Sequence, residues 1–180
     1  REVLLTMPPR GSLREARAFA EKHGGWIAAR IARLPEAVPF SDGAIVPLRG
    51  IERRIAHRKG ERGTVWVEDG ASSECENLLC VAGEEAHIRR RVGDFLKREA
   101  RRDLDRASRR YADQLGVKIE RISVRDTSSR WGSCSASGAL SFSWRLVLAP
   151  PPVLKYLAAH EVAHIVEMNH SRRFWGILDR

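Results

Sequence analysis

The hydrophobic and polar positions of the chain follow two different periods in its C-terminal half. Between residues 84 and 115, apolar side chains recur at steps of three and four, which predicts a long helix with one buried face. Gly116 follows at the position where a left-handed helix cap is expected. From residues 140 to 148, apolar and polar side chains alternate, which predicts a strand. Three prolines at residues 150–152 end that strand and precede a second helix, expected from about residue 151 to residue 168.

The N-terminal half predicts a helix followed by a small sheet. Ser12 and Glu15 form a capping-box pattern at the start of the helix, and the glycine pair at residues 24–25 is expected to weaken or break it. Between residues 44 and 82, short apolar runs are separated by turn residues, which predicts an antiparallel meander. Its four strands are expected in the runs AIVPL, IERRIAHR, GTVWVED and ENLLCVA.

Together these elements predict an α+β fold with a soft boundary near Gly83. Residues 1–83 would form an N-terminal lobe of mixed α/β structure that contains the antiparallel meander. Residues 84–180 would form the half that carries the candidate chemistry. We expect the two halves to make one compact unit, because 180 residues suffice for one ordinary domain or for a domain with a small lobe.

Composition narrows the choice of partners and compartments. Lys and Arg outnumber Asp and Glu by 32 to 23, which gives a net charge of +9. A nucleic acid is therefore a candidate partner, although a solvated surface of mixed charges also accounts for this balance. The three cysteines fit neither a zinc knuckle nor a disulfide framework, so a reducing, cytoplasmic setting is expected. The apolar runs are too short to cross a membrane, and no membrane partner is expected.

Three of the six histidines fall within residues 160–170. His160 and His164 lie four residues apart on the predicted helix, so both imidazoles project from one face and can reach one ion. Glu161 lies between them and completes an H-E-x-x-H motif. In this motif two neutral imidazoles bind Zn²⁺, and the carboxylate accepts a proton from a zinc-bound water. The motif predicts one zinc ion, and other divalent transition metals would also suit these ligands.

A catalytic zinc site needs a third protein ligand and one open position. His170 is the preferred candidate, but on a continued helix it would point away from His164, so the helix must end before it. Asn readily adopts the left-handed conformation that ends helices, and we therefore expect the turn at Asn169. Glu167 remains an alternative, as a ligand or as a partner of a histidine N–H, because it lies seven residues after His160 on nearly the same face.

The motif and its flanking segments resemble the YgjP-like metallopeptidase family, a group of zincins related to SprT-type proteases. The matching blocks are RWGSCSASGALSFSWRLVLAPP at residues 130–151 and YLAAHEVAHIVEMNHSRRFW at residues 156–175, with looser matches in WIAARIARLP and PFSDGAIVPLRG. The resemblance implies a zincin-like fold, in which an antiparallel sheet packs against the active-site helix and a second long helix. It also implies a zinc cofactor with a catalytic base and three metal ligands, namely Glu161 as the base and His160, His164 and His170 as the ligands.

The predicted function is hydrolysis of peptide bonds by a zinc-bound water that Glu161 activates. A peptide or protein substrate is expected to pair with the strand of residues 140–148, if that strand lies at a sheet edge. Polar side chains near the motif are candidates for binding the substrate or stabilising the oxyanion: Arg130, Ser143, Arg145 and Tyr156. Family members usually carry Asn at the position of Ser143.

Two alternatives to a simple peptidase stay open. A basic nucleic-acid-binding protein would use its metal ion structurally, as the net charge of +9 allows. A protease of the SprT type that is recruited to DNA would combine peptide cleavage with a basic surface.

Overall fold

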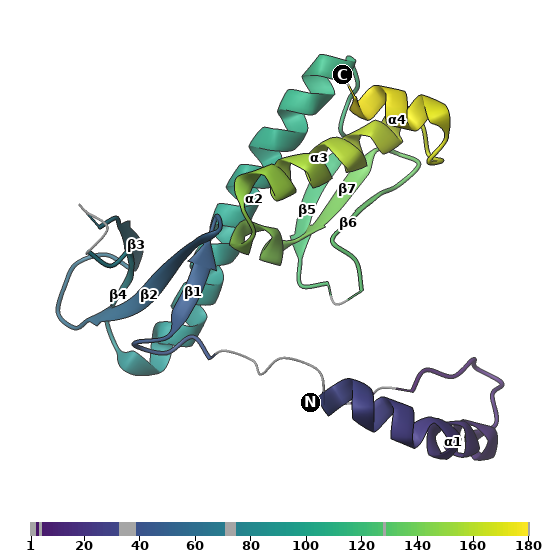
Figure 1. Cartoon of the computed structure of the whole chain (residues 1–180), viewed down its shortest axis with the longest axis horizontal. Coiled ribbons are helices and arrows are strands. Elements are labelled where there is room, and N and C mark those ends of the chain that lie inside the picture. The colour runs from purple at the N-terminus through teal and green to yellow at the C-terminus, as the bar shows by residue number, and fades with distance from the viewer. Residues whose placement is uncertain (1–2, 4, 33–38, 71–74, 128, 180) are drawn as a thin grey trace. The chain divides into compact units, whose positions relative to one another are not determined.

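The computed structural model describes residues 3, 5–32, 39–70, 75–127 and 129–179. The chain divides into two compact units, Arg1–Val38 and Pro39–Arg180, which are described separately below (Figure 1). The division at residue 83 that the sequence suggests stays a prediction.

The first unit contains one long helix, α1 (Leu13–Ala32). The Ser12 hydroxyl oxygen accepts a hydrogen bond from the backbone N–H of Glu15 at 3.4 Å, as the capping pattern predicts. The predicted interruption at the glycine pair is wrong, because the helix continues through Gly24 and Gly25. Glycine costs about 1 kcal/mol in a helix interior, a penalty that weakens a helix without breaking it. No α1 residue is buried.

Four strands of the second unit form the first sheet, in the order β1-β2-β4-β3. The strands are β1 (Ile45–Leu48), β2 (Ile51–Arg58), β3 (Val65–Glu68) and β4 (Leu78–Ala82). The strand runs are confirmed, but the meander is wrong, because β4 inserts between β2 and β3 and pairs with β2 in parallel. The cause is composition: β4 is almost entirely buried, and a continuous apolar strand is stable at the centre of a sheet.

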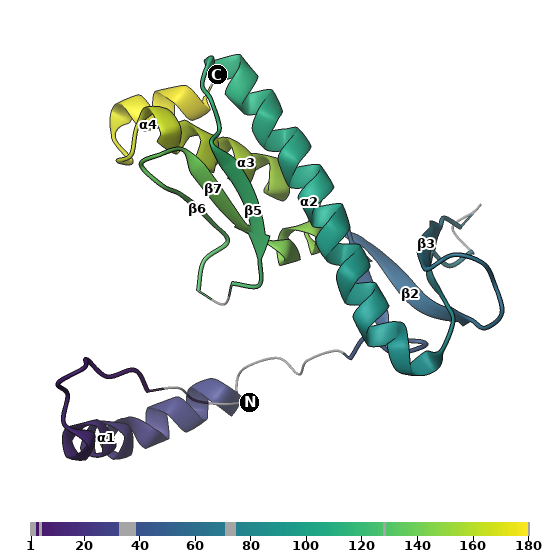
Figure 2. The ribbon, with the colours of Figure 1, turned by 180° about the vertical axis from the view of Figure 1, so that it is seen from behind.

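A long helix, α2 (Ile88–Leu115), follows a short 3₁₀ turn, η1 (Glu85–His87), and packs against both sheets (Figure 2). The sequence predicts this helix, and it also predicts the cap at Gly116, whose φ of 65° lies in the left-handed region. One face of α2 is buried, including Val92, Leu96 and Leu104. The helix therefore forms a common support for the two sheets.

The second sheet has three strands in the order β5-β7-β6. They are β5 (Arg121–Arg125), β6 (Gly132–Cys134) and β7 (Ala139–Ser143). The central strand β7 is parallel to β5 and antiparallel to β6. Both sheets are thus mixed, and the expectation of an antiparallel sheet holds only for some strand pairs.

The predicted strand of residues 140–148 is half right. After Ser143 the chain forms a 3₁₀ helix, η2 (Trp144–Leu148), instead of continuing as a strand. Trp144 and Val147 lie three residues apart and are both buried, because residues at this spacing share one face of a 3₁₀ helix. The segment WRLVL has apolar residues at steps of two and of three, so the pattern could not distinguish a strand from a 3₁₀ helix.

The turn between β1 and β2 contacts α2, η2 and Pro150. Arg49 has a φ of 55°, and its N–H donates to the carbonyl of Val147 at 2.7 Å. Its guanidinium pairs with Asp103 at 2.7 Å and with Glu99 at 2.8 Å, both on α2. At Gly50, an added Cβ would lie 2.9 Å from a side-chain carbon of Pro150. This turn, Arg49–Gly50, is therefore closely packed against all three of them.

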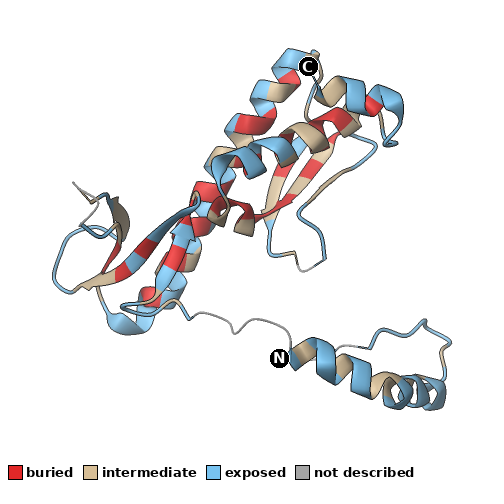
Figure 3. Cartoon of the chain, in the orientation of Figure 1, coloured by how far each residue is buried: buried red, intermediate tan, exposed pale blue. Residues whose placement is uncertain are grey.

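Two helices complete the second unit, α3 (Pro151–Val166) and α4 (Arg172–Leu178). One hydrophobic core extends through this unit, and its members come from both sheets, η2, α2 and α3 (Figure 3). In the described part of the chain, none of the helices combines the length and the apolar content that a membrane span requires.

Candidate metal centre

Helix α3 carries the first two histidines of the motif on one face. His160 and His164 are one turn apart and half-buried, and their ring centroids lie 4.9 Å apart. Glu161 faces the interior with only 5% of its surface exposed. The helical spacing thus separates the carboxylate from the two imidazoles, as the motif predicts.

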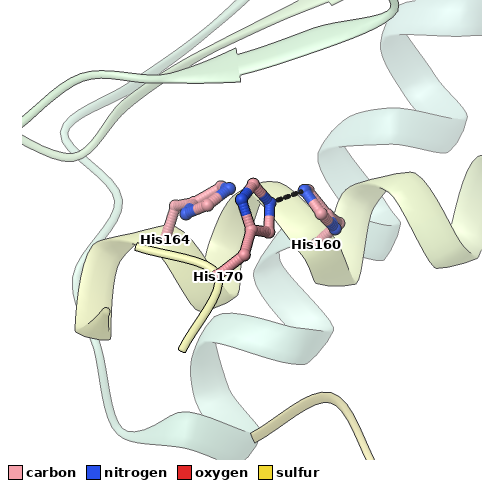
Figure 4. Close-up of side chains that lie close together, drawn as sticks. All are labelled: His160, His164 and His170. Carbon is pink, nitrogen blue, oxygen red and sulfur yellow. Dashed lines mark hydrogen bonds between the residues drawn. The ribbon is translucent and has the colours of Figure 1, made fainter. Parts of the chain in front are cut away.

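The helix ends earlier than the sequence predicts, and by another conformation. Its last residue is Val166, and Glu167 is extended, with φ −142° and ψ 107°. Asn169 does not adopt the left-handed conformation, since Arg49 is the one described non-glycine residue with positive φ. The chain nevertheless turns back after the helix, and His170 returns to the other two histidines (Figure 4).

The segment after the turn is held by the next helix. The Ser171 hydroxyl caps α4 by accepting a hydrogen bond from the N–H of Phe174 at 3.4 Å. The Phe174 ring is fully buried, and its centroid lies 4.6–4.9 Å from the ring centroids of all three histidines. This phenyl ring forms the apolar support on which the three imidazoles pack.

The three imidazoles offer donor atoms that suit one metal ion. Their ligand nitrogens all lie within 4.8 Å of one another, and the Nε2 atoms of His160 and His170 are 3.0 Å apart. Two ligands of a tetrahedral zinc ion, each about 2.0–2.1 Å from the metal, stand roughly 3.3–3.4 Å apart. Small rotations of the rings would meet this geometry. Among the described residues the cluster holds these three groups, and the Glu167 carboxylate is not one of them.

Glu167 contacts the site through its backbone. Its carbonyl oxygen lies 3.1 Å from Nδ1 of His164, so Nδ1–H can donate to it and leave Nε2 free as a ligand atom. His160 is less completely satisfied: its Nδ1 is buried and has no hydrogen-bond partner in the described structure. Burial, with smaller contributions from the two neighbouring histidines, lowers the pKa of His160. A lowered pKa favours the neutral imidazole that binds metals.

The environment of Glu161 makes it a stronger base than an ordinary glutamate. Burial raises its pKa to about 7, and the positive charge of Arg130 opposes this effect only in part. Gly132 packs directly against the carboxyl group: a Cβ added there would lie 2.5 Å from Oε1. The carboxyl group is therefore confined between α3 and the edge of the second sheet.

The four substrate-binding candidates differ in their exposure and in their position relative to the histidines. Tyr156 lies on α3 with half of its surface exposed, and its ring centroid is 6.1 Å from that of His160. Arg130 and Arg145 line one surface cavity of about 520 Å³, where Arg145 forms an ion pair with Asp126. Ser143 is buried, and its hydroxyl has no partner among the described residues.

Two further residues shape the site and were not identified as part of it from the sequence. Gly132 lies within the R-W-G-S-C segment, and Phe174 lies four residues after His170. Cys134, close to Glu161, is a poor candidate for a nucleophile: burial, reinforced by the negative charge of Glu161, raises the pKa of its thiol to about 11.

In a comparison with protein families, one family model matches residues 1–180 of the chain. The matching family is described as YgjP-like, metallopeptidase domain. Searches of curated proteins and of solved structures give no significant match.

Proposed function

Since the chain belongs to the YgjP-like metallopeptidase family, we propose that it is a zinc-dependent peptidase whose metal is held by His160, His164 and His170. The observation that carries this proposal is the convergence of three imidazoles beside one buried carboxyl group. When bound, a zinc ion supplies a Lewis acid that polarises a carbonyl and acidifies a water.

Glu161 is the base of the proposed reaction. Its carboxylate accepts the proton of the attacking water and then delivers it to the nitrogen of the leaving amine. A pKa of about 7 suits both steps near neutral pH, because the group can take up and release a proton with little free-energy cost. Gly132 leaves room for the carboxyl group to reach the water.

β7 lies between β5 and β6, so the condition that the strand at 140–148 lies at a sheet edge is not met. β6 is an edge strand of this sheet and is the one next to Glu161, so it replaces that strand in the proposal. The two residues that flank β6 face β7, because the N–H of Ser135 donates to the carbonyl of Ala139 and the carbonyl of Trp131 accepts from the N–H of Ser143. Backbone groups alternate in direction along a strand, so those of Gly132 and Cys134 face the free edge. We propose that an extended substrate pairs with these two residues.

Side chains around the three histidines would supply the remaining contacts with the substrate. Tyr156 is the preferred donor to the developing oxyanion, because it lies one turn before His160 and is exposed. Arg145 is less suited, since Asp126 already neutralises it. Trp175 is half-exposed, with its ring centroid 6.5 Å from that of His160. Tyr156 and Trp175 together favour substrates with large apolar side chains near the cleaved bond.

A purely structural metal site is the weaker alternative. Structural zinc sites usually have four protein ligands, often cysteines. The described residues supply three histidines to this cluster, and the nearby Cys134 is not a member. Three protein ligands leave one position open, which is the arrangement of catalytic zinc sites.

Substitution of Glu161 by Gln distinguishes a catalytic zinc site from a structural one. If zinc is catalytic, Glu161→Gln should retain one metal per chain and lose peptide cleavage by a factor of about 10² or more, since the general base is removed. Metal content is measured by mass spectrometry and cleavage with a fluorogenic peptide mixture. A matched control is Glu167→Gln, whose side chain lies outside the cluster.

Two results would contradict the proposal. A Glu161→Gln variant that still cleaves peptides at the wild-type rate would exclude Glu161 as the base. A wild-type chain that binds no Zn²⁺, Co²⁺ or Mn²⁺ in excess metal would exclude the metal site itself.

A further inference from the structure

A second cavity, with no residue in common with the histidine cluster, lies between α2 and the start of α3. Its volume is about 210 Å³. One wall is a face of α2 that includes Arg106 and Arg110, and another is the first part of α3, which includes Lys155. A space of this size suits a ligand of about ten non-hydrogen atoms, below the range of drug-sized ligands.

The charges around this cavity are unbalanced. Its lining contains Arg49, Arg106, Arg110 and Lys155, against the single carboxylate of Asp103, so four positive charges and one negative charge give +3. Asp103 is already paired with Arg49 at 2.7 Å. The three other cations have no ion pair or hydrogen bond to a side chain in the described structure.

The neighbouring arginines of the same helix behave differently. Arg109 pairs with Asp105 at 2.9 Å, and Arg102 pairs with Glu99 at 2.6 Å. Neither of them lines the cavity. Arg106 and Arg110 are thus without such partners at the cavity, whereas Arg102 and Arg109 on the same helix are neutralised outside it.

The floor of the cavity is apolar. Ala107, Val147 and Leu154 line it and are buried, and the ring of Tyr111 forms part of the wall. A small inorganic anion would leave this surface uncovered, whereas a flat apolar group would cover it and exclude water.

We infer that this cavity binds a small phosphomonoester that carries a flat apolar group. The phosphate would contact Arg106, Arg110 and Lys155, and the apolar group would pack on Tyr111 and Leu154. A phosphomonoester carries nearly two negative charges at pH 7, and guanidinium groups match its oxygens with paired hydrogen bonds. A carboxylate offers only one charge to the three free cations.

Phenyl phosphate is a suitable probe, because it combines the two groups in about eleven non-hydrogen atoms. Binding to the full chain is measured by calorimetry at low salt, with a chelator present so that no metal ion competes for the phosphate. We expect saturable binding, at least tenfold tighter than that of inorganic phosphate or of phenol.

Variants identify the binding residues. Arg106→Gln and Arg110→Gln should each weaken phenyl phosphate binding about tenfold or more, because each removes a charge-assisted hydrogen bond. Arg109→Gln is the matched control: it removes the same charge from the same helix outside the cavity and should change the affinity less than threefold. All three side chains are exposed, so the variants should fold.

Three results would overturn the inference. Arg109→Gln could weaken binding as much as Arg106→Gln, which would indicate attraction to the general positive charge. Phenyl phosphate could bind no tighter than inorganic phosphate, which would exclude a role for the apolar floor. An absence of saturable binding up to 10 mM, roughly the weakest affinity that a site of this kind would have, would exclude the site.

Discussion

Gly132 is required where a strand edge approaches the proposed base. An added Cβ would lie 2.5 Å from Oε1 of Glu161 and 2.8 Å from its Cγ, so the whole carboxyl end of the side chain would have to move. We predict that Gly132→Ala lowers kcat by about tenfold to a hundredfold, because a displaced base loses its geometry. Metal affinity should stay within about threefold of wild type. Steady-state kinetics and a zinc titration measure the two effects.

Gly93 provides the control for this substitution. It lies within α2, and an added Cβ there meets no atom within 4 Å. Gly93→Ala should therefore leave kcat unchanged and increase the free energy of unfolding by about 0.5–1 kcal/mol, since alanine is the better helix former. If both variants lose activity equally, the contact between Gly132 and Glu161 is not the cause.

The raised pKa of Glu161 makes a prediction about stability. Burial raises this pKa from 4.5 to about 7 in the folded chain, so the folded state binds the proton more tightly than the unfolded state. The stability is therefore fully present below pH 4.5 and is lost as the pH rises through 7. In metal-free protein, Glu161→Gln should be more stable than wild type at pH 8, by on the order of 2–3 kcal/mol, and equally stable at pH 4.

Urea unfolding of both proteins at pH 4, 6 and 8, in the presence of a chelator, measures this difference. Comparing the variant with wild type at each pH cancels the titration of other groups, including the three histidines. A difference that is constant with pH would mean that Glu161 is as well solvated as in the unfolded chain.

Among the elements, the end of α3 illustrates how far the sequence determines the site. The spacing of His160 and His164 fixes their common face, because helical geometry is local. The return of His170 depends on the conformation of residues 167–169. The sequence predicted a left-handed turn at Asn169, but the helix ends instead at the extended Glu167. The packing of Phe174 under the imidazoles, which no local pattern encodes, supports the return.

The order of the strands in each sheet could not be predicted from the sequence pattern either. Alternation and apolar runs locate β1, β2, β3 and β4, because these signals are local. The insertion of β4 between β2 and β3 depends on which strand gains most from burial on both sides, and this is a property of the assembled core. For the same reason, the sequence pattern could not show that β7 is the central strand and that β6 is an edge strand.

The free edge of β6 predicts how a substrate responds to changes in its own backbone. If Gly132 and Cys134 pair with an extended peptide, substrate N–H groups will alternate between facing β6 and facing away. N-methylation of the amides that face β6 should lower kcat/KM by about tenfold each, and methylation of the others should have little effect. A scan of singly N-methylated peptides tests this.

A two-residue period in that scan would agree with pairing at the edge. Equal sensitivity at every position would contradict it, since it would mean that the methyl groups act by bulk alone. Val153→Ala, a change on the exposed side of α3, serves as a control for unspecific effects on the enzyme.

At the scale of the whole molecule, residues 39–180 contain a complete core. Every buried member of that core lies between Val46 and Val162, and α1 has no buried residue. We predict that the chain without residues 1–38 folds, binds one zinc ion and unfolds thermally within about 4 °C of the full chain, a shift that corresponds to roughly 1 kcal/mol or less. Calorimetry and metal analysis of the shortened chain measure this. Failure to fold would show that the first unit stabilises the second.

Some of the positive charges on the surface are paired with carboxylates. On α2, Arg90 pairs with Asp94 at 3.6 Å and Arg109 pairs with Asp105 at 2.9 Å. Exposed pairs of this kind contribute little to stability but reduce the local field. A nucleic-acid partner stays a prediction, and Arg106 and Arg110 at the α2–α3 cavity are among the cations that such pairs leave free.

Because of the Arg49–Gly50 turn, the two ends of the first sheet should differ in how well they tolerate an inserted peptide. A peptide inserted at this turn would push against Pro150, and the disturbance would reach the first residues of α3 and hence the histidines. At the opposite end, Gly60 has an exposed position and no atom within 4 Å of an added Cβ. An epitope tag or a fluorescent reporter should therefore be tolerated near Gly60 and should abolish activity at Gly50, although both loops join strands of the same sheet.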